Sequence, residues 1–366
     1  MSGLALALLL GWPGNPEGLL TKLPPAPLAV YAVAWRRELV TPKEVFPFEE
    51  GGVAVDPGSG IAVCGTRDGW LHAVRQDGQI LWEFKTRGPF PAPPAIAGDS
   101  VYAGSSDGHV YALALADGKL RWSYDAGEEM GTRPAVAAGV VYVMSLQDTL
   151  IALDGKTGQW KWLHRREARG IDRGYTIRGA ASALVRGSSV FGAYSDGFVA
   201  ALDATNGQVR WERQVAPSGE YTDVDSLWLE GKRLYAAAYS GEVLALDPDT
   251  GVTLWSVRAP RASRVTSTGA LVVAEGASQL LGLAPGNGQP LWSVPLEGSP
   301  GGAPVAAGRW VLVPAQEGGL RFVEPATGRT LRIFDGGNGV TGEPAVNGRR
   351  VYVLSNGGSL YALDLE

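Results

Sequence analysis

The sequence contains very little cysteine and histidine. Cys64 is the single cysteine among 366 residues, which excludes an intrachain disulfide and a cysteine-rich metal site. The three histidines, His72, His109 and His164, lie far apart in the sequence, so we predict no metal site. Cys64 stands in the apolar run GIAVCGT, and we expect it to be a small buried residue of a strand.

Long runs of charge of one sign are also missing. The 32 basic and 37 acidic residues give a net charge of −5, and nothing in their distribution indicates a nucleic-acid partner. The sequence shows no nucleophile-elbow serine, no phosphate-binding glycine loop and no metal-ligand spacing. It therefore predicts a protein that is not an enzyme and holds no cofactor.

Apolar runs long enough to cross a membrane are lacking as well. The stretch LALALLLGW near the N-terminus is too short to span a bilayer, and basic residues do not precede it as they precede most secretory signals. We expect residues 1–27 to be an N-terminal tail or the remnant of a signal segment. No other segment is predicted to be transmembrane.

Glycine and proline are abundant, with 51 and 24 residues and no collagen-like triplet period. The composition is typical of a chain that turns often. Residues 131–164 illustrate this, because four short apolar runs alternate there with turn sequences such as GKTG. Helix-period patterns do not occur, so the fold class is predicted to be all-β with antiparallel four-stranded units.

A glycine turn followed by tryptophan recurs along the chain, as in ALDATNGQVRWERQV at residues 200–214. The tryptophan stands four residues after the glycine in six copies: Gly78/Trp82, Gly118/Trp122, Gly158/Trp162, Gly207/Trp211, Gly251/Trp255 and Gly288/Trp292. With Gly328 added, the glycines are spaced by 40, 40, 49, 44, 37 and 40 residues. A period near 40 with four strands is typical of a β-propeller blade.

The strand pair that precedes each turn occurs in eight copies, from TRDGWLHAV to NGGSLYAL. The last copy lacks an outer strand, whereas LAVYAVAWRREL at residues 28–39 carries Trp35 without inner strands. We therefore predict one eight-bladed β-propeller over residues 28–366, closed by the N-terminal strand, which completes the last blade.

The repeated tryptophans are predicted to be structural. A buried indole covers roughly 150–250 Å² and can donate its N–H to a backbone carbonyl, so each would set the packing between adjacent blades. The predicted set is Trp35, Trp82, Trp122, Trp162, Trp211, Trp255 and Trp292. Arg332 replaces tryptophan in the seventh copy, where either the blade boundary is looser or the arginine stem covers the groove.

The ALDxxTGxxxW repeat resembles that of pyrroloquinoline-quinone enzymes and of their non-enzymatic relatives, the BamB family of outer-membrane assembly lipoproteins. The quinoprotein dehydrogenases place two adjacent cysteines beside the quinone and are longer, so this resemblance is weaker. The resemblance to the BamB family extends over the chain from about residue 28. It departs at the N-terminus, since that family carries a lipidated cysteine there and this sequence has none nearby.

The two longest intervals between the turn glycines, of 49 and 44 residues, each contain an extra segment, and these segments strengthen the resemblance to the BamB family. The corresponding segments of that family help to bind the periplasmic domains of the central barrel-assembly protein. The resemblance assigns partner binding to Tyr175, Ile177 and Arg178 in the first segment and to Asp223 and Asp225 in the second. The residues themselves leave an alternative open, in which Tyr175 and Ile177 form the buried face of a strand and the two aspartates cap a turn. The extra arginines Arg165, Arg166, Arg169 and Arg173 are expected to lie in a solvated loop.

The resemblance implies a non-catalytic scaffold of the bacterial envelope, periplasmic and associated with the outer membrane. Its partner would be the central subunit of the outer-membrane β-barrel assembly complex, in which this chain would be a monomeric accessory subunit. The alternative is a propeller that binds or senses a quinone-like small molecule in its central channel. Fold alone does not decide between them, because propellers host unrelated functions.

Overall fold

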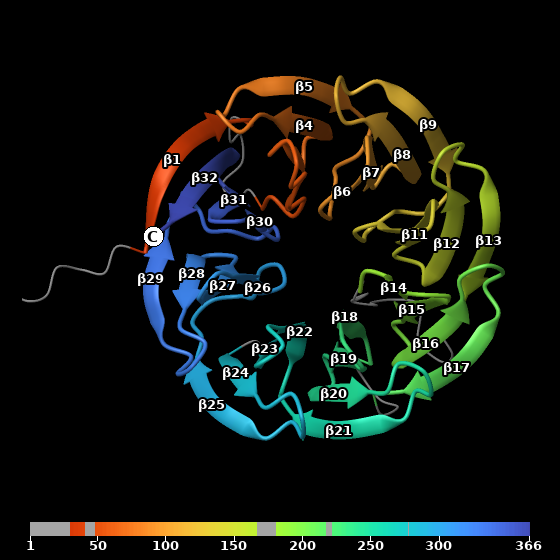
Figure 1. Cartoon of the computed structure of the whole chain (residues 1–366), viewed down its shortest axis with the longest axis vertical. Helices are drawn as coiled ribbons and strands as arrows, with labels where there is room; N and C mark the ends of the chain where they lie inside the picture. The colour runs from red at the N-terminus through yellow and green to blue at the C-terminus, as the bar shows by residue number, and fades with distance from the viewer. Residues whose placement is uncertain (1–29, 41–47, 167–180, 217–221, 277) are drawn as a thin grey trace, which may run out of the picture.

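The described residues of this computed structural model, 30–40, 48–166, 181–216, 222–276 and 278–366, contain strands and no helix. They form eight separate four-stranded sheets, in which the described strand pairs are antiparallel. The sheets are arranged as blades around a central axis (Figure 1). The predicted all-β, eight-bladed propeller is confirmed.

Each blade runs from the central axis to the rim. The innermost strands are β2 (Val53–Val55), β6 (Ala95–Ala97), β10 (Ala135–Ala137), β14 (Leu184–Arg186), β18 (Val224–Glu230), β22 (Ala262–Ser267), β26 (Val305–Ala307) and β30 (Ala345–Asn347). The second strands are β3 (Ala62–Gly65), β7 (Ser100–Gly104), β11 (Val140–Met144), β15 (Ser189–Ala193), β19 (Arg233–Ala238), β23 (Val272–Gly276), β27 (Trp310–Ala315) and β31 (Arg350–Leu354).

The other two strands of each blade lie nearer the rim. The third strands are β4 (Trp70–Val74), β8 (His109–Ala114), β12 (Thr149–Asp154), β16 (Phe198–Asp203), β20 (Glu242–Leu246), β24 (Gln279–Leu283), β28 (Gly319–Val323) and β32 (Ser359–Leu365). The outermost strands are β5 (Ile80–Lys85), β9 (Leu120–Asp125), β13 (Trp160–Arg165), β17 (Val209–Gln214), β21 (Thr253–Arg258), β25 (Pro290–Pro295), β29 (Thr330–Phe334) and β1 (Tyr31–Glu38).

Blades 1 to 7 each consist of four consecutive strands, from β2–β5 to β26–β29. Blade 8 has the order β1-β32-β31-β30, so the first strand of the chain pairs with the last (Figure 1). The register runs from Tyr31 opposite Leu365 to Glu38 opposite Ser359. The predicted closure of the ring by the N-terminal strand is confirmed.

The repeated tryptophans lie on the outermost strands and are buried or half-buried. Each donates its Nε1–H to a backbone carbonyl of the following blade, at between 2.7 and 3.1 Å. The pairs are Trp35–Gln76, Trp82–Leu115, Trp122–Gly155, Trp162–Ala204, Trp211–Pro248, Trp255–Pro285 and Trp292–Pro325. Each indole therefore links two blades across their boundary.

The boundary between blades 7 and 8 is built differently, because no chain connects β32 to β1 and the turn that would receive a tryptophan does not exist. Arg332 is exposed there and pairs with Phe322, at a position where most other blades have alanine. Tyr31 of β1 stacks on Phe322 with ring centroids 4.9 Å apart. Aromatic rings thus fill this boundary. Neither expectation for Arg332, a looser boundary or a groove covered by the arginine stem, describes it.

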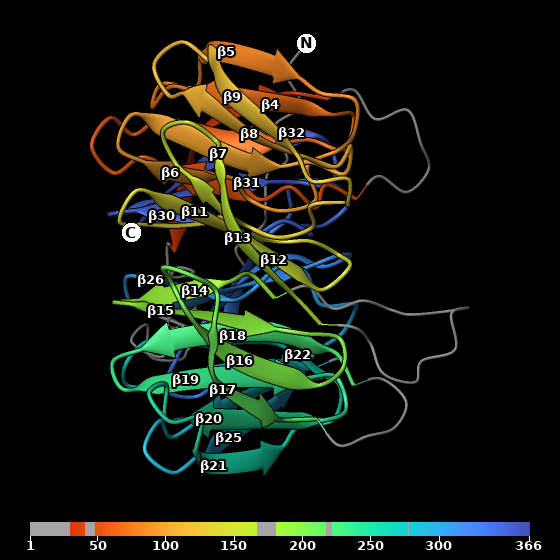
Figure 2. The same ribbon diagram turned by 90° about the vertical axis from the view of Figure 1, so that its right-hand side faces the viewer.

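The hydrophobic core is divided into eight clusters, one at each blade boundary. Cys64 is buried in β3, as expected. Seen from the side, the ring is a disc that is thinner than it is wide (Figure 2). Across the described ranges, no helix has the length and apolarity needed to cross a bilayer.

Candidate functional site

The predicted site residues fall into two groups. Tyr175, Ile177 and Arg178 belong to the range 167–180, which lies outside the described residues. Asp223 and Asp225 are described, and they stand at the start of blade 5, directly after the undescribed range 217–221. The geometry that can be built therefore consists of the aspartates and of the residues that flank both ranges.

Asp225 lies on the innermost strand β18, at a bulge between Val224 and Ser226. Burial raises the pKa of its carboxyl to about 7; the Arg264 guanidinium opposes this increase and the Asp223 carboxylate adds to it. Asp223 is buried, and its backbone carbonyl accepts the amide of Tyr239 at 3.0 Å. The predicted aspartates thus lie near each other and near an arginine of the next blade.

Arg264 of β22 is anchored to the backbone, since its Nε donates to the carbonyl of Gly301 at 3.2 Å and its Nη1 to that of Ser263 at 2.8 Å. Its charge also lowers the pKa values of Glu50 and Glu343, which burial raises above their ordinary range. These two carboxyls precede the innermost strands of blades 1 and 8. One arginine therefore attracts carboxyls from several blades.

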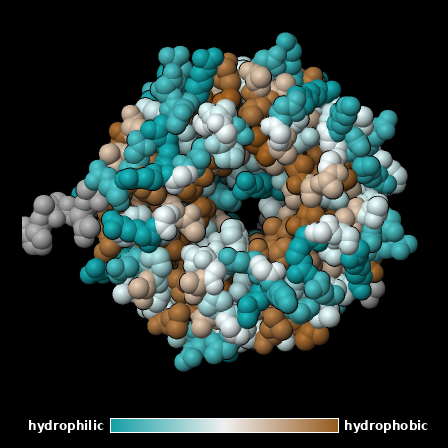
Figure 3. Space-filling view, viewed as in Figure 1, coloured by the Kyte–Doolittle hydropathy of each residue, from teal (hydrophilic) through white to brown (hydrophobic). Residues whose placement is uncertain are grey.

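The central channel is visible as a hollow in the middle of the disc (Figure 3). Arg133, which precedes β10 of blade 3, forms an ion pair with Glu343 of blade 8 at 3.1 Å. Because blades 1 and 2 separate these residues along the ring, the pair crosses the channel. The amide of Arg133 also donates to the hydroxyl of Ser182 at 3.2 Å, just beyond the range 167–180.

Arg166 is the last described residue before the range 167–180. Its Nε and Nη2 each lie 2.9 Å from Oδ2 of Asp196, and its Nη1 pairs with Glu212. The guanidinium also lies over the Phe198 ring, 4.2 Å from the centroid. With its side chain only 16% exposed, Arg166 does not belong to the solvated loop that the sequence led us to expect.

Arg165 pairs with Glu128 and donates its Nε to the Thr149 hydroxyl at 2.8 Å, so it too has defined partners. Arg169 and Arg173 lie outside the described residues. The expectation of a solvated arginine loop is therefore wrong for Arg166 in particular. A solvated loop residue would keep its guanidinium in water, whereas this one faces two carboxylates and an aromatic ring.

The turn Ser195–Gly197, between β15 and β16 of blade 4, is contacted by described residues next to both undescribed ranges. Val215 and Ala216 donate their amides to the carbonyl of Gly197 at 2.8 and 3.2 Å. The Thr222 hydroxyl donates to the carbonyl of Ser195 at 2.7 Å. Together with Arg166 on Asp196, these bonds place the residue before 167–180 and the residues on both sides of 217–221 against a single turn.

Asp148 of blade 3 completes this cluster from the other side of the blade boundary. Its Oδ1 accepts the amide of Ser195 at 3.0 Å, and its Oδ2 accepts the Ser195 hydroxyl. Sequence reasoning did not single out Asp148, and it assigned Arg166 to a solvated loop. Alignment of the repeats contains the signal, because SLQD at residues 145–148 has aspartate where SSDG at 105–108 and YSDG at 194–197 have glycine.

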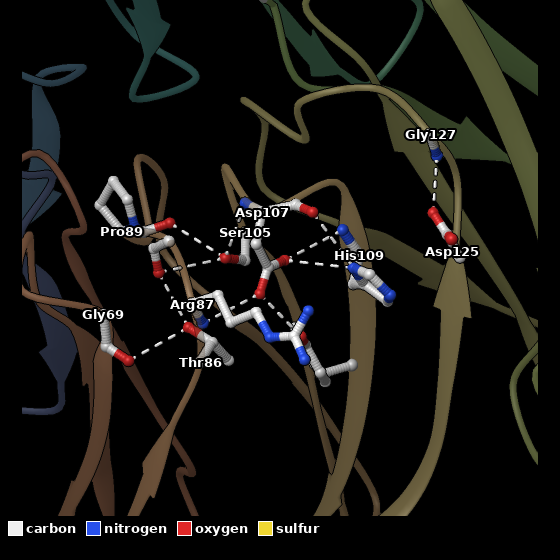
Figure 4. A network of polar contacts seen from close by, with 11 residues as sticks. Gly69, Thr86, Arg87, Pro89, Ser105, Asp107, His109, Asp125 and Gly127 are labelled. Atoms are coloured by element: carbon white, nitrogen blue, oxygen red, sulfur yellow. Dashed lines mark hydrogen bonds and ion pairs between the residues drawn. The ribbon is translucent and has the colours of Figure 1, made fainter.

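A polar network at the boundary of blades 1 and 2 offers a comparison without a long inserted segment (Figure 4). Asp107 accepts the amide of Arg87 at 3.2 Å and the Tyr111 hydroxyl at 2.8 Å. The Ser105 hydroxyl donates to the carbonyls of Gly88 and Pro89 at 3.2 and 3.3 Å. Polar contacts between a connecting loop and the next blade thus occur at more than one boundary, and Asp148 and Arg166 add further contacts of this kind between blades 3 and 4.

The clusters described here carry charge and hydrogen-bonding groups rather than a reactive centre. Within the described ranges, no three His, Cys, Asp or Glu side chains are grouped to hold a metal ion. What the arrangement offers chemically is a set of ion pairs and hydrogen bonds among residues that stand next to the ranges 167–180 and 217–221 in the chain. Such contacts can position a surface for binding another protein.

The sequence and the fold match known proteins. The model of a family described as "Outer membrane protein assembly factor BamB" matches residues 32–131, 67–245 and 240–366. The protein of that name from Shewanella oneidensis is 29% identical over 312 residues, which cover 82% of this chain and 68% of that protein. Its counterpart from Pseudomonas aeruginosa is 30% identical over 201 residues, covering 52% of this chain and 53%, about half, of that relative.

Among solved structures, BamB from Moraxella catarrhalis superimposes with a TM-score of 0.77 at 21% identity, covering 92% of this chain and 100% of that one. The quinohemoprotein alcohol dehydrogenase from Comamonas testosteroni gives a TM-score of 0.74 at 15% identity, covering 93% and 77%. At these identities, both likenesses concern the fold alone.

Proposed function

This chain belongs to the family of the outer membrane protein assembly factor BamB, and from that membership we propose that it is an accessory subunit of the outer-membrane β-barrel assembly machinery. In this role residues 28–366 form one rigid ring in the periplasm, associated with the outer membrane. The ring binds the periplasmic domains of the central subunit and performs no chemistry of its own.

One observation of the structure supports this proposal. Arg166, which precedes the range 167–180, and Ala216 and Thr222, on either side of 217–221, all contact the same turn of blade 4. Two segments far apart in the sequence can therefore contribute to one continuous binding surface. We propose that Tyr175, Ile177 and Arg178 provide its contacts, because tyrosine and arginine are enriched among residues that dominate binding energy.

A non-catalytic role is proposed on two grounds. The relatives matched above are named as assembly factors, and the resemblance to quinone enzymes would require a pair of adjacent cysteines. Cys64 is the single cysteine, and it is fully buried in β3. Asp223 and Asp225, at the start of blade 5, are proposed to contribute to the same partner-binding surface.

The test is binding of the purified chain to the purified periplasmic domains of the central subunit, measured by biolayer interferometry. Arg178→Glu is expected to weaken binding at least tenfold, with an unchanged melting temperature, since a hot-spot arginine contributes about 2 kcal/mol or more. Arg329→Glu is the matched control, because Arg329 is an exposed arginine in the turn before β29 of blade 7. It should bind like the wild type.

Two outcomes contradict the proposal. If the wild type does not bind these domains, the assignment of the partner is wrong. If Arg178→Glu and Arg329→Glu bind equally well, the partner assignment stands and the assigned contact residue is wrong.

A further inference from the structure

The boundary between blades 3 and 4 carries polar contacts that surround the flanks of both inserted segments. We propose that Asp148 and Arg166 are positioning residues, which form a lock that holds Arg166, Ala216 and Thr222, the described residues beside the two segments, in a fixed relation for partner binding. This inference rests on the proposed function and adds to it a mechanism of preorganisation. The lock is defined by Asp148, Arg166, Ser195, Asp196 and Glu212.

Asp148 occupies a backbone conformation for which six other blades have glycine at the equivalent position. Its φ is +61°, and the residues at the same turn position are Gly69, Gly108, Gly197, Gly241, Gly319 and Gly358, with φ between +74° and +106°. A residue with a side chain is strained in this region, so its presence there calls for a compensating interaction. The compensation is the carboxylate, which crosses the blade boundary and accepts both the amide and the hydroxyl of Ser195.

Arg166 is the second departure from the repeat. Its amide donates to the carbonyl of Asp148 at 3.2 Å, and the same backbone bond occurs at Thr86, Ala126, Val215, Ala259 and Leu296 in other blades. Those five side chains are uncharged, whereas Arg166 extends to Asp196 and Glu212 of blade 4. The backbone contact belongs to the fold, and the charged side chain is added where the segment 167–180 begins.

Both additions meet on Ser195–Gly197, the turn that also binds Ala216 and Thr222. The Asp148 carboxylate accepts the Ser195 amide, the Ser195 carbonyl accepts the Thr222 hydroxyl, and the Arg166 guanidinium donates to the Asp196 carboxylate. The two flanks are therefore connected through three consecutive residues. A displacement of blade 3 against blade 4 would break this chain of contacts and separate Arg166 from Ala216 and Thr222.

Such a lock affects the free energy of binding, because it reduces the conformational freedom that is lost on association. A partner that contacts two segments must otherwise restrict their relative placement at the moment of association, and that restriction opposes binding. If the placement is fixed in the free protein, the partner dissociates more slowly. The lock thus serves partner binding more than it serves the stability of the ring.

The experiment uses the full chain with Asp148→Gly, Asp148→Asn and Arg166→Met. Asp148→Gly adopts the backbone of the other blades without strain, so the melting temperature should change little. Asp148→Asn keeps an acceptor for the Ser195 amide and should rescue part of the effect. The control is Asp107→Ala, which removes the contacts of the Asp107 carboxylate with Arg87 and Tyr111 at the boundary of blades 1 and 2 (Figure 4).

Hydrogen exchange of the free proteins is the first readout. Peptides that contain Ser195, Ala216 and Thr222 should exchange at least tenfold faster in Asp148→Gly and Arg166→Met, and at the wild-type rate in Asp107→Ala. Unchanged exchange in the two lock variants would overturn the inference, whatever the partner does.

Binding to the periplasmic domains is the second readout. The lock variants should dissociate about tenfold faster than the wild type and Asp107→Ala. Equal dissociation rates, with wild-type binding intact, would show that Asp148 and Arg166 are merely structural. A wild type that does not bind would refute the proposed function, and the exchange result alone would then decide whether the lock exists.

Discussion

At the scale of single residues, the ring depends on pairs of one glycine and one tryptophan. The repeat places them four positions apart, but in space each glycine meets the tryptophan of the preceding blade. An added Cβ at Gly118 would lie 2.7 Å from Cδ2 of Trp82, and one at Gly158 would lie 2.6 Å from the same atom of Trp122. The missing side chain therefore creates the space into which the indole of the neighbouring blade packs.

Gly118→Ala tests this pairing against Gly139→Ala. Both glycines have positive φ, +71° and +77°, but a Cβ at Gly139 would meet nothing within 4 Å. We expect Gly139→Ala to lower the free energy of unfolding by about 1 kcal/mol, from the backbone conformation alone. Gly118→Ala should lower it by about 2–3 kcal/mol more, because it also displaces Trp82.

Urea denaturation of both variants beside the wild type provides the measurement. Equal losses of stability in the two variants would mean that the indole contact is not limiting. The idea that glycine makes room for the tryptophan of the preceding blade would then be wrong.

At the scale of strands, β1 differs from the other outermost strands in the way it is attached to its blade. It joins blade 8 without a connecting turn, and the contacts of Tyr31 take the place of the tryptophan link. The Tyr31 ring stacks on Phe322 and meets Phe334 edge-on at 5.7 Å, while its hydroxyl donates to the carbonyl of Ile333 at 3.4 Å. Closure therefore relies on aromatic packing and on the β1–β32 ladder.

Tyr31→Ala is expected to open the ring at this boundary. The truncation should lower the free energy of unfolding by about 2–4 kcal/mol, in the range observed for large aromatic truncations at partly buried sites. Amide exchange should accelerate in both β29 and β32, because the two strands lose their common neighbour. Tyr124→Ala is the control, since Tyr124 is a half-buried tyrosine on β9, where the chain is continuous.

Exchange in Tyr124→Ala should increase only near β9. If Tyr31→Ala also affects exchange only at its own strand, β1 is not the closing element of the ring. Native-state hydrogen exchange with peptide resolution is sufficient to distinguish the two results.

At the scale of the whole molecule, the sequence predicts the eight blades and the closing strand because both follow from local patterns repeated along the chain. Contacts between blades do not follow from such patterns. Asp148 and Ser195 are 47 positions apart, and Arg264 approaches Asp225 from the next blade. The assignment of the candidate site to two segments rests on the resemblance and stays a prediction, and the long-range contacts beside those segments could not be derived from spacing.

Buried carboxyls are a second property of the whole molecule. Burial raises the pKa of Glu275 in β23 to about 8, with the charges of Arg264 and Arg321 opposing the increase. In the described part of the molecule, Oε2 of Glu275 has no hydrogen-bond partner. Burial also raises the pKa of Glu49 to about 7, although the amide of Arg67 donates to it and the guanidinium lies nearby. The folded chain thus holds protons that the unfolded chain releases.

These shifts predict that the ring is more stable in mild acid than in mild base. Between the ordinary carboxyl pKa and about 8, the unfolded state binds fewer protons than the folded state, so the free energy of unfolding falls as pH rises. Each such group contributes at most about 1.4 kcal/mol per pH unit over its own window. Stabilisation by the protonated form is complete below the ordinary pKa and is lost as pH passes the raised value.

Glu275→Gln isolates one group, because glutamine stays neutral at every pH. Relative to the wild type, the variant should gain stability from pH 5 to about pH 8 and then level off, while the exposed control Glu317→Gln should follow the wild-type profile. Urea midpoints measured at each pH unit provide the comparison. Parallel profiles for the wild type and Glu275→Gln would mean that Glu275 is already ionised in the folded ring, held by Arg264 and Arg321 against the effect of burial.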